Sequence, residues 1–293
     1  MALKNYKNKK FKKIIILSFI NFYILLNQIL IKKKNNKNYK IVAISYASEK
    51  FIKQLKINEL TAIKVGKVDK YYSYKFDDID LNFLKKNKDI LSRPRGNGYW
   101  LWKPYFILKT FKEKLNKGDY LIYTDAGIFD LDKVEKIIKF MKSINEDIRL
   151  VQLSVIEKHY SKRDAFILLD ADSPIYTDTF QYMAGIQIYK KSEFTENFLE
   201  KLLKYSTDKR IITDDPNTQG LPNYHEFIDN RHDQTVLSLL FKKFRFSNKD
   251  KNKTTADDLN KINYNFKTKI FCIYRSIPFK NIYDLRKICN EKV

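Results

Sequence analysis

An acidic residue, Asp125, ends a short apolar run and is followed directly by Ala126 and Gly127. The run itself, residues 120–124, is aromatic and β-branched and follows turn residues, which predicts a buried strand of a parallel sheet. Ligands of open α/β sheets lie beyond the carboxyl ends of the strands, so this carboxylate is placed to meet a ligand. Carboxylate oxygens suit Mg²⁺ and Mn²⁺, which makes Asp125 a candidate metal ligand. An Asp at this place can also cap the next segment or form a turn.

A second candidate segment, residues 92–105 (SRPRGNGYWLWKPY), holds both tryptophans of the chain together with two arginines, two glycines and two prolines. It leads into a helical pattern over 105–115. Glycines, guanidinium groups and aromatic faces before a helix N-terminus suit an anionic, ring-bearing ligand. The alternative is that the tryptophans pack in the core and the arginines face solvent. We favour a functional loop, because so many aromatic, glycine, proline and arginine residues are costly to place in a loop that only connects two elements.

The densest group of acid and base side chains is residues 224–234 (YHEFIDNRHDQ), with two histidines, several carboxylates and one arginine. Asp233 comes just before or within the first turn of a helix predicted over 235–241, where the helix dipole favours a carboxylate. That position explains Asp233 as a helix cap. It equally suits a catalytic carboxylate.

The elements that must position these residues alternate between strands and helices along one stretch of chain. A strand over 180–189 has Ala184 and Gly185 at its centre, which often marks close approach of backbone or ligand. A polar segment, 206–224, is predicted as a surface loop or lid. The other predicted strands cover 39–47, 65–74 and 149–156, and the other helices cover 48–60, 130–144 and 191–205.

The composition bounds the class of protein. Apolar content of 44% and aromatic content of 15% exclude a largely disordered chain. The net charge is +23, and the excess of positive residues is nearly all lysine, spread along the chain with many Asn and Ile residues. We therefore favour a generally lysine-rich, solvated surface over a groove that binds nucleic acid. The two cysteines, Cys272 and Cys289, are isolated and indicate neither a disulfide framework nor a zinc site.

The N-terminus carries an uncharged run of eighteen residues, 14–31, with lysines on both sides. That length reaches the lower limit for crossing a bilayer. Asn21, Asn27 and Gln28 make the run marginally apolar. No small-residue cleavage site follows, so a single-pass membrane anchor is favoured over a signal peptide or an interfacial helix. The flanking lysines leave its orientation undetermined. The domain prediction is a basic N-terminus with this helix and a linker over 1–37, and one domain over 38–293.

Five blocks in order resemble those of GT-A-type nucleotide-sugar glycosyltransferases: 96–104 (GNGYWLWKP), 118–119 (GD), 123–127 (YTDAG), 183–186 (MAGI) and 231–234 (RHDQ). The resemblance covers roughly residues 40–245 and is closest to members with a GYWLWKP block and a DAG motif. It implies an α/β fold with a Rossmann-like, mostly parallel central sheet flanked by helices. It also implies a nucleotide-diphospho-sugar substrate and a divalent metal, Mn or Mg, held by a short acidic motif.

Residue by residue, the resemblance implies that Asp125 is the first Asp of a D-x-D motif and binds the metal, and that Asp233 and Gln234 act at the reacting sugar. The third position of the motif is Gly127 rather than an acid. Either Asp125 has help from Asp130 or His232, or Arg and Lys side chains neutralise the diphosphate without a metal. The residues implied to bind the nucleotide sugar are Ser45, Tyr46, Arg95, Trp102, Lys103, Thr124, Ala184 and Gly185.

The function predicted from these observations is a membrane-anchored glycosyltransferase. It would move a sugar from a nucleotide-diphospho-sugar, UDP-linked, to a hydroxyl acceptor on a glycan, lipid or protein. If the reaction inverts the anomeric centre, Asp233 is the candidate base; if it retains, Asp233 or Gln234 stabilises the oxocarbenium-like centre. The alternatives are a non-catalytic carbohydrate-binding or scaffolding protein on the same fold and, last, a basic nucleic-acid-binding protein. Nucleic acid is not among the predicted partners.

Overall fold

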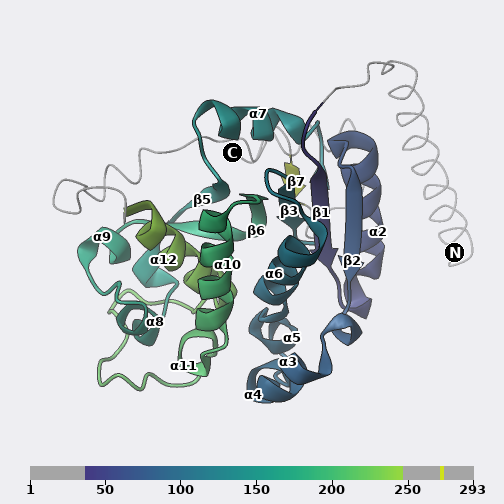
Figure 1. Cartoon of the computed structure of the whole chain (residues 1–293). Coiled ribbons are helices and arrows are strands. Elements are labelled where there is room, and N and C mark those ends of the chain that lie inside the picture. The colour runs from purple at the N-terminus through teal and green to yellow at the C-terminus, as the bar shows by residue number, and fades with distance from the viewer. Residues whose placement is uncertain (1–36, 247–270, 274–293) are drawn as a thin grey trace, which may run out of the picture.

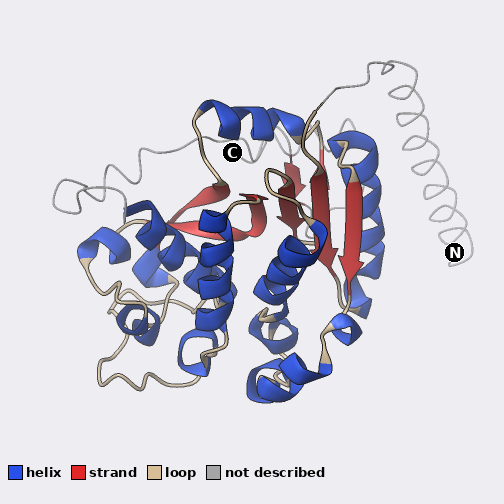
Figure 2. Cartoon of the chain, in the orientation of Figure 1, coloured by secondary structure: helices blue, strands red, loops and turns tan. Residues whose placement is uncertain are grey.

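The computed structural model describes residues 37–246 and 271–273. Its main sheet consists of five strands: β1 (Ile41–Tyr46), β2 (Lys70–Tyr74), β3 (Tyr120–Thr124), β5 (Ile148–Ile156) and β6 (Phe180–Lys190). Their order is β2-β1-β3-β6-β5 (Figure 2). β1 pairs in parallel with β2 and β3, and β6 is antiparallel to both β3 and β5. Every strand except β6 therefore runs in the same direction.

This architecture confirms the predicted α/β class with a mostly parallel sheet. Every residue of β1 and β3 is buried, as expected for central strands that are covered on both faces. A second, two-stranded sheet pairs β4 (Ile128–Asp130) with β7 (Phe271–Ile273) in antiparallel fashion.

Helices cover both faces of the main sheet (Figure 1). On one face lie α6 (Trp102–Lys114), α10 (Glu193–Ser206) and α12 (Asp233–Phe246), whose apolar residues share one core with Val42, Ile44 and Leu121. On the other face lie α2 (Ile52–Thr61) and α7 (Glu135–Ser143). The buried residues of α7 share the second core with Ile41, Ala43 and Ile122, and Leu55 of α2 packs with Ala47 and Ala126. The shorter helices are α3 (Leu81–Lys86), α4 (Lys88–Leu91), α8 (Arg163–Leu168), α9 (Pro174–Thr177) and α11 (Lys209–Ile212).

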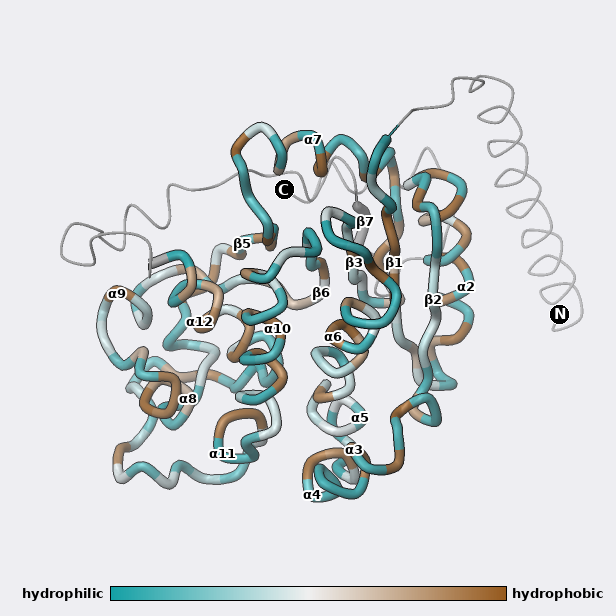
Figure 3. Tube along the Cα trace, viewed as in Figure 1, coloured by the Kyte–Doolittle hydropathy of each residue, from teal (hydrophilic) through white to brown (hydrophobic). Residues whose placement is uncertain are grey.

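α10 illustrates why these segments are helical. Its N-cap, Ser192, accepts a hydrogen bond from the Thr195 backbone N at 3.2 Å and so satisfies one of the free amides of the first turn. Phe198, Leu199 and Leu202 are buried at helical spacing against the sheet. Figure 3 shows the same alternation of apolar and hydrophilic stretches along the helices, and a mostly hydrophilic loop after α11.

A left-handed turn, labelled α5 (Gly96–Tyr99), precedes α6. Its backbone φ angles are positive at five successive residues: Gly96 (+59°), Asn97 (+57°), Gly98 (+92°), Tyr99 (+52°) and Trp100 (+59°). L-residues disfavour this conformation, and single residues rather than runs normally adopt it. A Cβ on Gly98 would lie 2.6 Å from the Leu91 Cα, so glycine is required there for space as well as for φ. Strained backbone of this kind is concentrated at functional sites.

Several predicted boundaries differ from the structure. The segment 62–66 continues the helical path after α2, so β2 is shorter than the predicted strand over 65–74. Residues 128–130 form strand β4, so α7 begins at Glu135 rather than at the predicted residue 130. Part of the predicted loop over 206–224 forms α11. The predicted anchor, 14–31, lies outside the described residues, and within residues 37–246 and 271–273 no helix is long and apolar enough to cross a bilayer.

Candidate functional site

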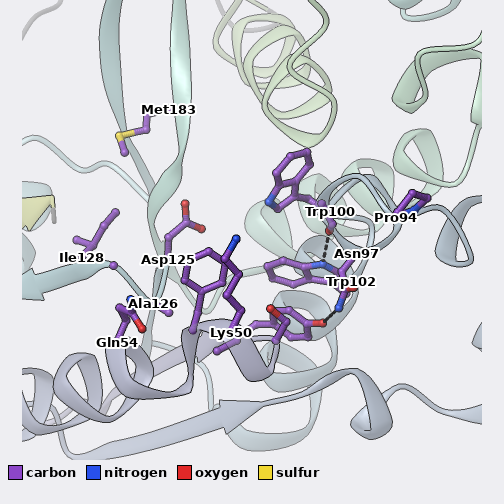
Figure 4. Close-up of a pocket in the computed structure, with 16 residues that line it drawn as sticks. Lys50, Gln54, Pro94, Asn97, Trp100, Trp102, Asp125, Ala126, Ile128 and Met183 are labelled. Carbon is purple, nitrogen blue, oxygen red and sulfur yellow. Dashed lines mark hydrogen bonds between the residues drawn. The ribbon is translucent and has the colours of Figure 1, made fainter. Parts of the chain in front are cut away.

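A cleft of about 600 Å³ lies where β1 and β3 end (Figure 4). Tyr46, the last residue of β1, and the segment that follows it to Gln54 line one side. The left-handed turn with its flanking residues lines a second side, and residues 125–128 after β3 form a third. This is the carboxyl edge of the parallel strands, where ligands of open α/β sheets bind. The structure therefore brings Asp125 and the double-tryptophan segment to one cleft.

The aromatic wall of the cleft is held together by hydrogen bonds from the left-handed turn. The rings of Tyr46 and Trp102 are stacked, with centroids 3.7 Å apart and planes inclined by 18°. Trp102 Nε1 donates to the Gly96 carbonyl at 2.9 Å, and Asn97 Nδ2 donates to the Tyr46 hydroxyl at 2.6 Å. Trp100 also lines the cleft. Both tryptophans thus contribute to this wall, and Trp102 is at the same time part of the core.

The charged centre of the site consists of Asp125, Lys103 and Asp233. Lys103 Nζ lies 2.8 Å from Asp233 Oδ2 and 3.3 Å from Asp125 Oδ1. The Tyr123 hydroxyl donates to the same Asp125 oxygen at 2.6 Å. The side chain of Asp125 is 37% exposed and lines the cleft, whereas those of Lys103 and Asp233 are only 4% and 9% exposed. The Lys103–Asp233 pair therefore lies behind the Asp125 carboxylate.

Burial and pairing act in opposite directions on these groups. Burial raises the pKa of Asp233 to about 6, although Lys103 lowers it. Burial also works against the charge of Lys103, but Asp125 and Asp233 outweigh it and raise the pKa of Lys103. Burial, followed by the charge of Asp125, raises the pKa of Tyr123 well above its ordinary value. At neutral pH Lys103 is a cation between two carboxylates, and Tyr123 is a neutral hydroxyl donor.

Strand β6 approaches this centre through its two small residues. Asp125 N donates to the Gly185 carbonyl at 2.9 Å, and a Cβ on Gly185 would lie 3.0 Å from Asp125 Oδ2. Ala184 N donates to Gln234 Oε1 at 3.1 Å, and the Ala184 carbonyl lies 3.5 Å from Lys103 Nζ. The sequence predicts close approach at Ala184 and Gly185, and here the approaching groups are the side chains of the site itself.

Of the eight predicted binding residues, two line the cleft, Tyr46 and Trp102. Lys103, Ala184 and Gly185 adjoin the charged centre behind it, and the remaining three are engaged elsewhere. The guanidinium of Arg95 pairs with Asp214 at 2.9 Å and with Asp229 at 2.8 Å, in the loop that follows α11. Ser45 is buried and precedes Tyr46 in the strand, so the two side chains point to opposite faces of the sheet. Thr124 is buried, and its Oγ1 accepts from Asn58 Nδ2 at 2.9 Å.

Lys50 lines the cleft and is not among the residues that the sequence predicts. Its exposed side chain extends into the cavity on the side where Asp125 lies (Figure 4). Phe51, which is 46% exposed, and Gln54 line the cleft beside it. The signal for this segment was its place directly after the first strand, the same rule that identifies Asp125.

Asp125 is the one carboxylate among the described residues that line the cleft, and Asp233 lies behind it against Lys103, so the cleft offers a metal a single accessible carboxylate. In the described part of the chain, no three His, Cys, Asp or Glu residues cluster as a metal site. Asp130 is buried, and burial raises its pKa to about 8, so that it is a poor anionic ligand at neutral pH. His232 Nδ1 is 2.7 Å from the Ile212 carbonyl, and its ring packs on Trp100. Asp125 thus fits only a cation that takes most of its ligands from substrate and water, as Mg²⁺ often does.

Comparisons with known proteins give matches among solved structures only. No protein-family model matches the sequence, and no similar curated protein was found. Among the structures, the WbbM bifunctional glycosyltransferase matches 71% of this chain at 11% identity and a TM-score of 0.41, and the match spans 38% of the WbbM chain.

Two further structures have similar scores. Mouse xyloside xylosyltransferase 1 matches 70% of this chain and 82% of its own, at 9% identity and a TM-score of 0.40. Core-mannan synthase A from Aspergillus fumigatus, solved with Mn and GDP, matches 72% of both chains at 11% identity and a TM-score of 0.39. WbbM and the mouse enzyme are named as a glycosyltransferase and a xylosyltransferase, and all three TM-scores are below 0.5.

Proposed function

We propose that this protein is a glycosyltransferase that moves a sugar from a nucleotide-diphospho-sugar, UDP-linked, to a hydroxyl group of a glycan, lipid or protein acceptor. One observation carries the proposal: Asp125 stands half-exposed in a cleft at the carboxyl edge of the sheet, backed by Lys103 and Asp233 and faced by a wall of stacked aromatic rings. Ring faces suit a nucleobase, and charged groups suit a diphosphate and a sugar.

The chemical requirement is to stabilise negative charge on the departing nucleoside diphosphate. Lys50 is our candidate for contacting that group, because its ammonium extends into the cleft and Arg95 is engaged elsewhere. Asp125 would hold a diphosphate-bound divalent cation, which would supply further positive charge. Among the described residues that line the cleft, Asp125 is the one carboxylate.

Asp233 and Gln234 remain our candidates for action at the reacting sugar. The buried position of Asp233 supports a role through Lys103, whose ammonium it holds against Asp125. Gln234 contacts the Ala184 amide beside the same centre. A shift of these groups by an ångström would misalign the donor, and such misalignment is enough to slow transfer about a hundredfold.

The test is hydrolysis of a panel of UDP-, GDP- and CMP-sugars, with and without Mn²⁺, by the wild type and by Asp125→Asn. We expect hydrolysis of a UDP-sugar by the wild type and its loss in Asp125→Asn, with the fold retained. Glu193→Gln, which changes an exposed carboxylate of α10, is the matched control and should keep full activity. Full activity of Asp125→Asn would remove the central assignment. Nucleotide binding without any turnover would favour the carbohydrate-binding alternative.

A further inference from the structure

A row of polar side chains crosses the otherwise apolar contact between α12 and the sheet. Gln234, Ser238 and Lys242 follow one another at intervals of four residues, which places them on one face of α12. Ser238 and Lys242 are buried, at 0% and 1% exposure. Apart from Asp233 and Thr235 in the first turn, the other buried residues of the helix are apolar: Val236, Leu237, Leu239, Leu240 and Phe241. Burying polar groups in such a place is costly unless each has a partner.

The row ends at Glu157, which is fully buried just after β5. Its Oε1 accepts from Ser161 Oγ at 2.8 Å and from Gln181 Nε2 at 2.9 Å. Its Oε2 accepts from Ser238 Oγ and from the Lys242 ammonium. Lys242 can only donate hydrogen bonds, and it supplies the charge that balances the Glu157 carboxylate.

Two glutamine amides connect Glu157 to the site. Gln181 Oε1 accepts from Gln234 Nε2 at 2.7 Å, and Gln234 Oε1 accepts from the Ala184 backbone N at 3.1 Å. The backbone N–H at one end of this chain can only donate, and the carboxylate at the other end can only accept. The two amides between them therefore have a single arrangement that satisfies every bond. Reversing either amide would place two donors or two acceptors against each other.

We infer that Glu157 is a positioning residue for the transfer reaction: through Gln181 it sets the orientation of the Gln234 amide. Gln234 follows Asp233 directly, and its Oε1 is held at the backbone of Ala184, whose carbonyl lies 3.5 Å from Lys103 Nζ. A fixed carboxamide oxygen at this place holds the Ala184 backbone, and with it the carbonyl that Lys103 contacts, in one position beside the reacting centre. This inference rests on the proposed function, because the reaction is what the orientation serves.

A purely structural role for the ion pair predicts something different. Buried ion pairs contribute little net stability, and replacing both partners by neutral groups of similar size is often neutral or stabilising. If Glu157 and Lys242 served stability alone, a variant that lacks both charges and keeps its stability would also keep its activity. If they orient Gln234, such a variant keeps its stability and loses activity, because a neutral amide at position 157 no longer restricts Gln181 to donating.

The experiment compares the wild type with Glu157→Gln/Lys242→Met. We expect an unfolding midpoint equal to or above that of the wild type, a fall in kcat on the order of tenfold or more, and an unchanged KM for the donor. The side-chain amide signals of Gln181 and Gln234 in a ¹H–¹⁵N NMR spectrum should shift and exchange faster with solvent. The control, Lys190→Met/Asp147→Asn, removes an ion pair of 3.0 Å at the far end of β6 and should leave kcat and both glutamine signals unchanged.

Gln181→Met is a second variant, which removes the amide that links Glu157 to Gln234 and keeps the ion pair between Glu157 and Lys242. It should lower kcat to the same extent. It decides the case if the double variant does not fold. Wild-type kcat together with unshifted glutamine signals in a folded variant would overturn the inference. If the wild type itself transfers no sugar, the proposed function fails, and the glutamine signals still report whether Glu157 orients Gln234.

Discussion

The ammonium of Lys103 lies 2.8 Å from Asp233 Oδ2, and both side chains are buried beneath the cleft. Lys103 belongs to the first turn of α6 and Asp233 to the first turn of α12, so the contact joins the N-termini of two helices that are far apart in sequence. The same ammonium contacts Asp125 at the end of β3. The first turns of α6 and α12 and the end of β3 thus meet at the Lys103 ammonium, and the arrangement of side chains beneath the cleft depends on this cation.

Removing this cation should destabilise the protein. Lys103→Met leaves Asp125 and Asp233 without their shared partner, and loss of one member of a buried ion pair costs about 3–5 kcal/mol. Urea unfolding of the variant measures this loss. The control, Lys112→Met, removes a lysine that pairs with Glu200 at the surface and should cost less than about 1 kcal/mol. Equal stability of the two variants would show that Lys103 is not a structural counter-ion.

The left-handed turn should not tolerate a side chain at Gly98. Gly98→Ala would place a Cβ 2.6 Å from the Leu91 Cα, a backbone atom that cannot move aside cheaply. Backbone strain and the clash together should cost about 3 kcal/mol. Gly118→Ala is a matched control, because Gly118 has nearly the same φ (+91°) and nothing within 4 Å of its added Cβ. Its cost should be about 1 kcal/mol, from the backbone conformation alone. Denaturant midpoints that fall equally would contradict the steric explanation.

Asp130 should make stability depend on pH. Burial raises its pKa to about 8, whereas in the unfolded chain it titrates near 4, so between these values only the folded state binds the proton. Stability from this group is therefore highest at low pH and declines as pH rises, by up to about 1.4 kcal/mol per pH unit. Asp130→Asn removes this decline.

The measurement is the free energy of unfolding of Asp130→Asn and of the wild type between pH 5 and pH 8. The advantage of the variant should grow steadily with pH, since rising pH increasingly favours the ionised Asp130 of the unfolded chain while the folded wild type keeps its proton up to about pH 8. Parallel curves for the two proteins would mean that the Asp130 carboxyl is not held in an environment that favours its protonated form.

Binding of a divalent cation should require the nucleotide. Asp125 is a single carboxylate already in contact with Lys103 and Tyr123, so the protein alone offers a poor site for Mn²⁺. We expect calorimetric titration to show Mn²⁺ binding by the protein with UDP present and none at millimolar concentrations without it, and Asp125→Asn should abolish the binding seen with UDP. Tight Mn²⁺ binding by the free protein would indicate ligands beyond those described around Asp125.

Much of the fold could be predicted from local pattern. The central strands are short apolar runs bounded by turn residues, so the existence and order of these strands follow from sequence. Both tryptophans fall in one segment of unusual composition, which marks that segment in the sequence as well. The boundary near residues 128–134 could not be predicted, because β4 forms by pairing with β7 from a distant part of the chain. Local propensity carries no information about such a partner.

The amino-acid sequence alone determined that an acidic residue ends a buried strand beside a double-tryptophan segment, since short apolar runs and glycine-rich turns act through neighbouring residues. Only the tertiary structure decided what each charged side chain contacts. Arg95 resembles a diphosphate ligand in sequence, yet it pairs with Asp214 and Asp229, whereas Lys103 lies between Asp125 and Asp233. Electrostatic pairing depends on distance in space, and residues more than a hundred positions apart acquire that distance only when the sheet and its helices are assembled.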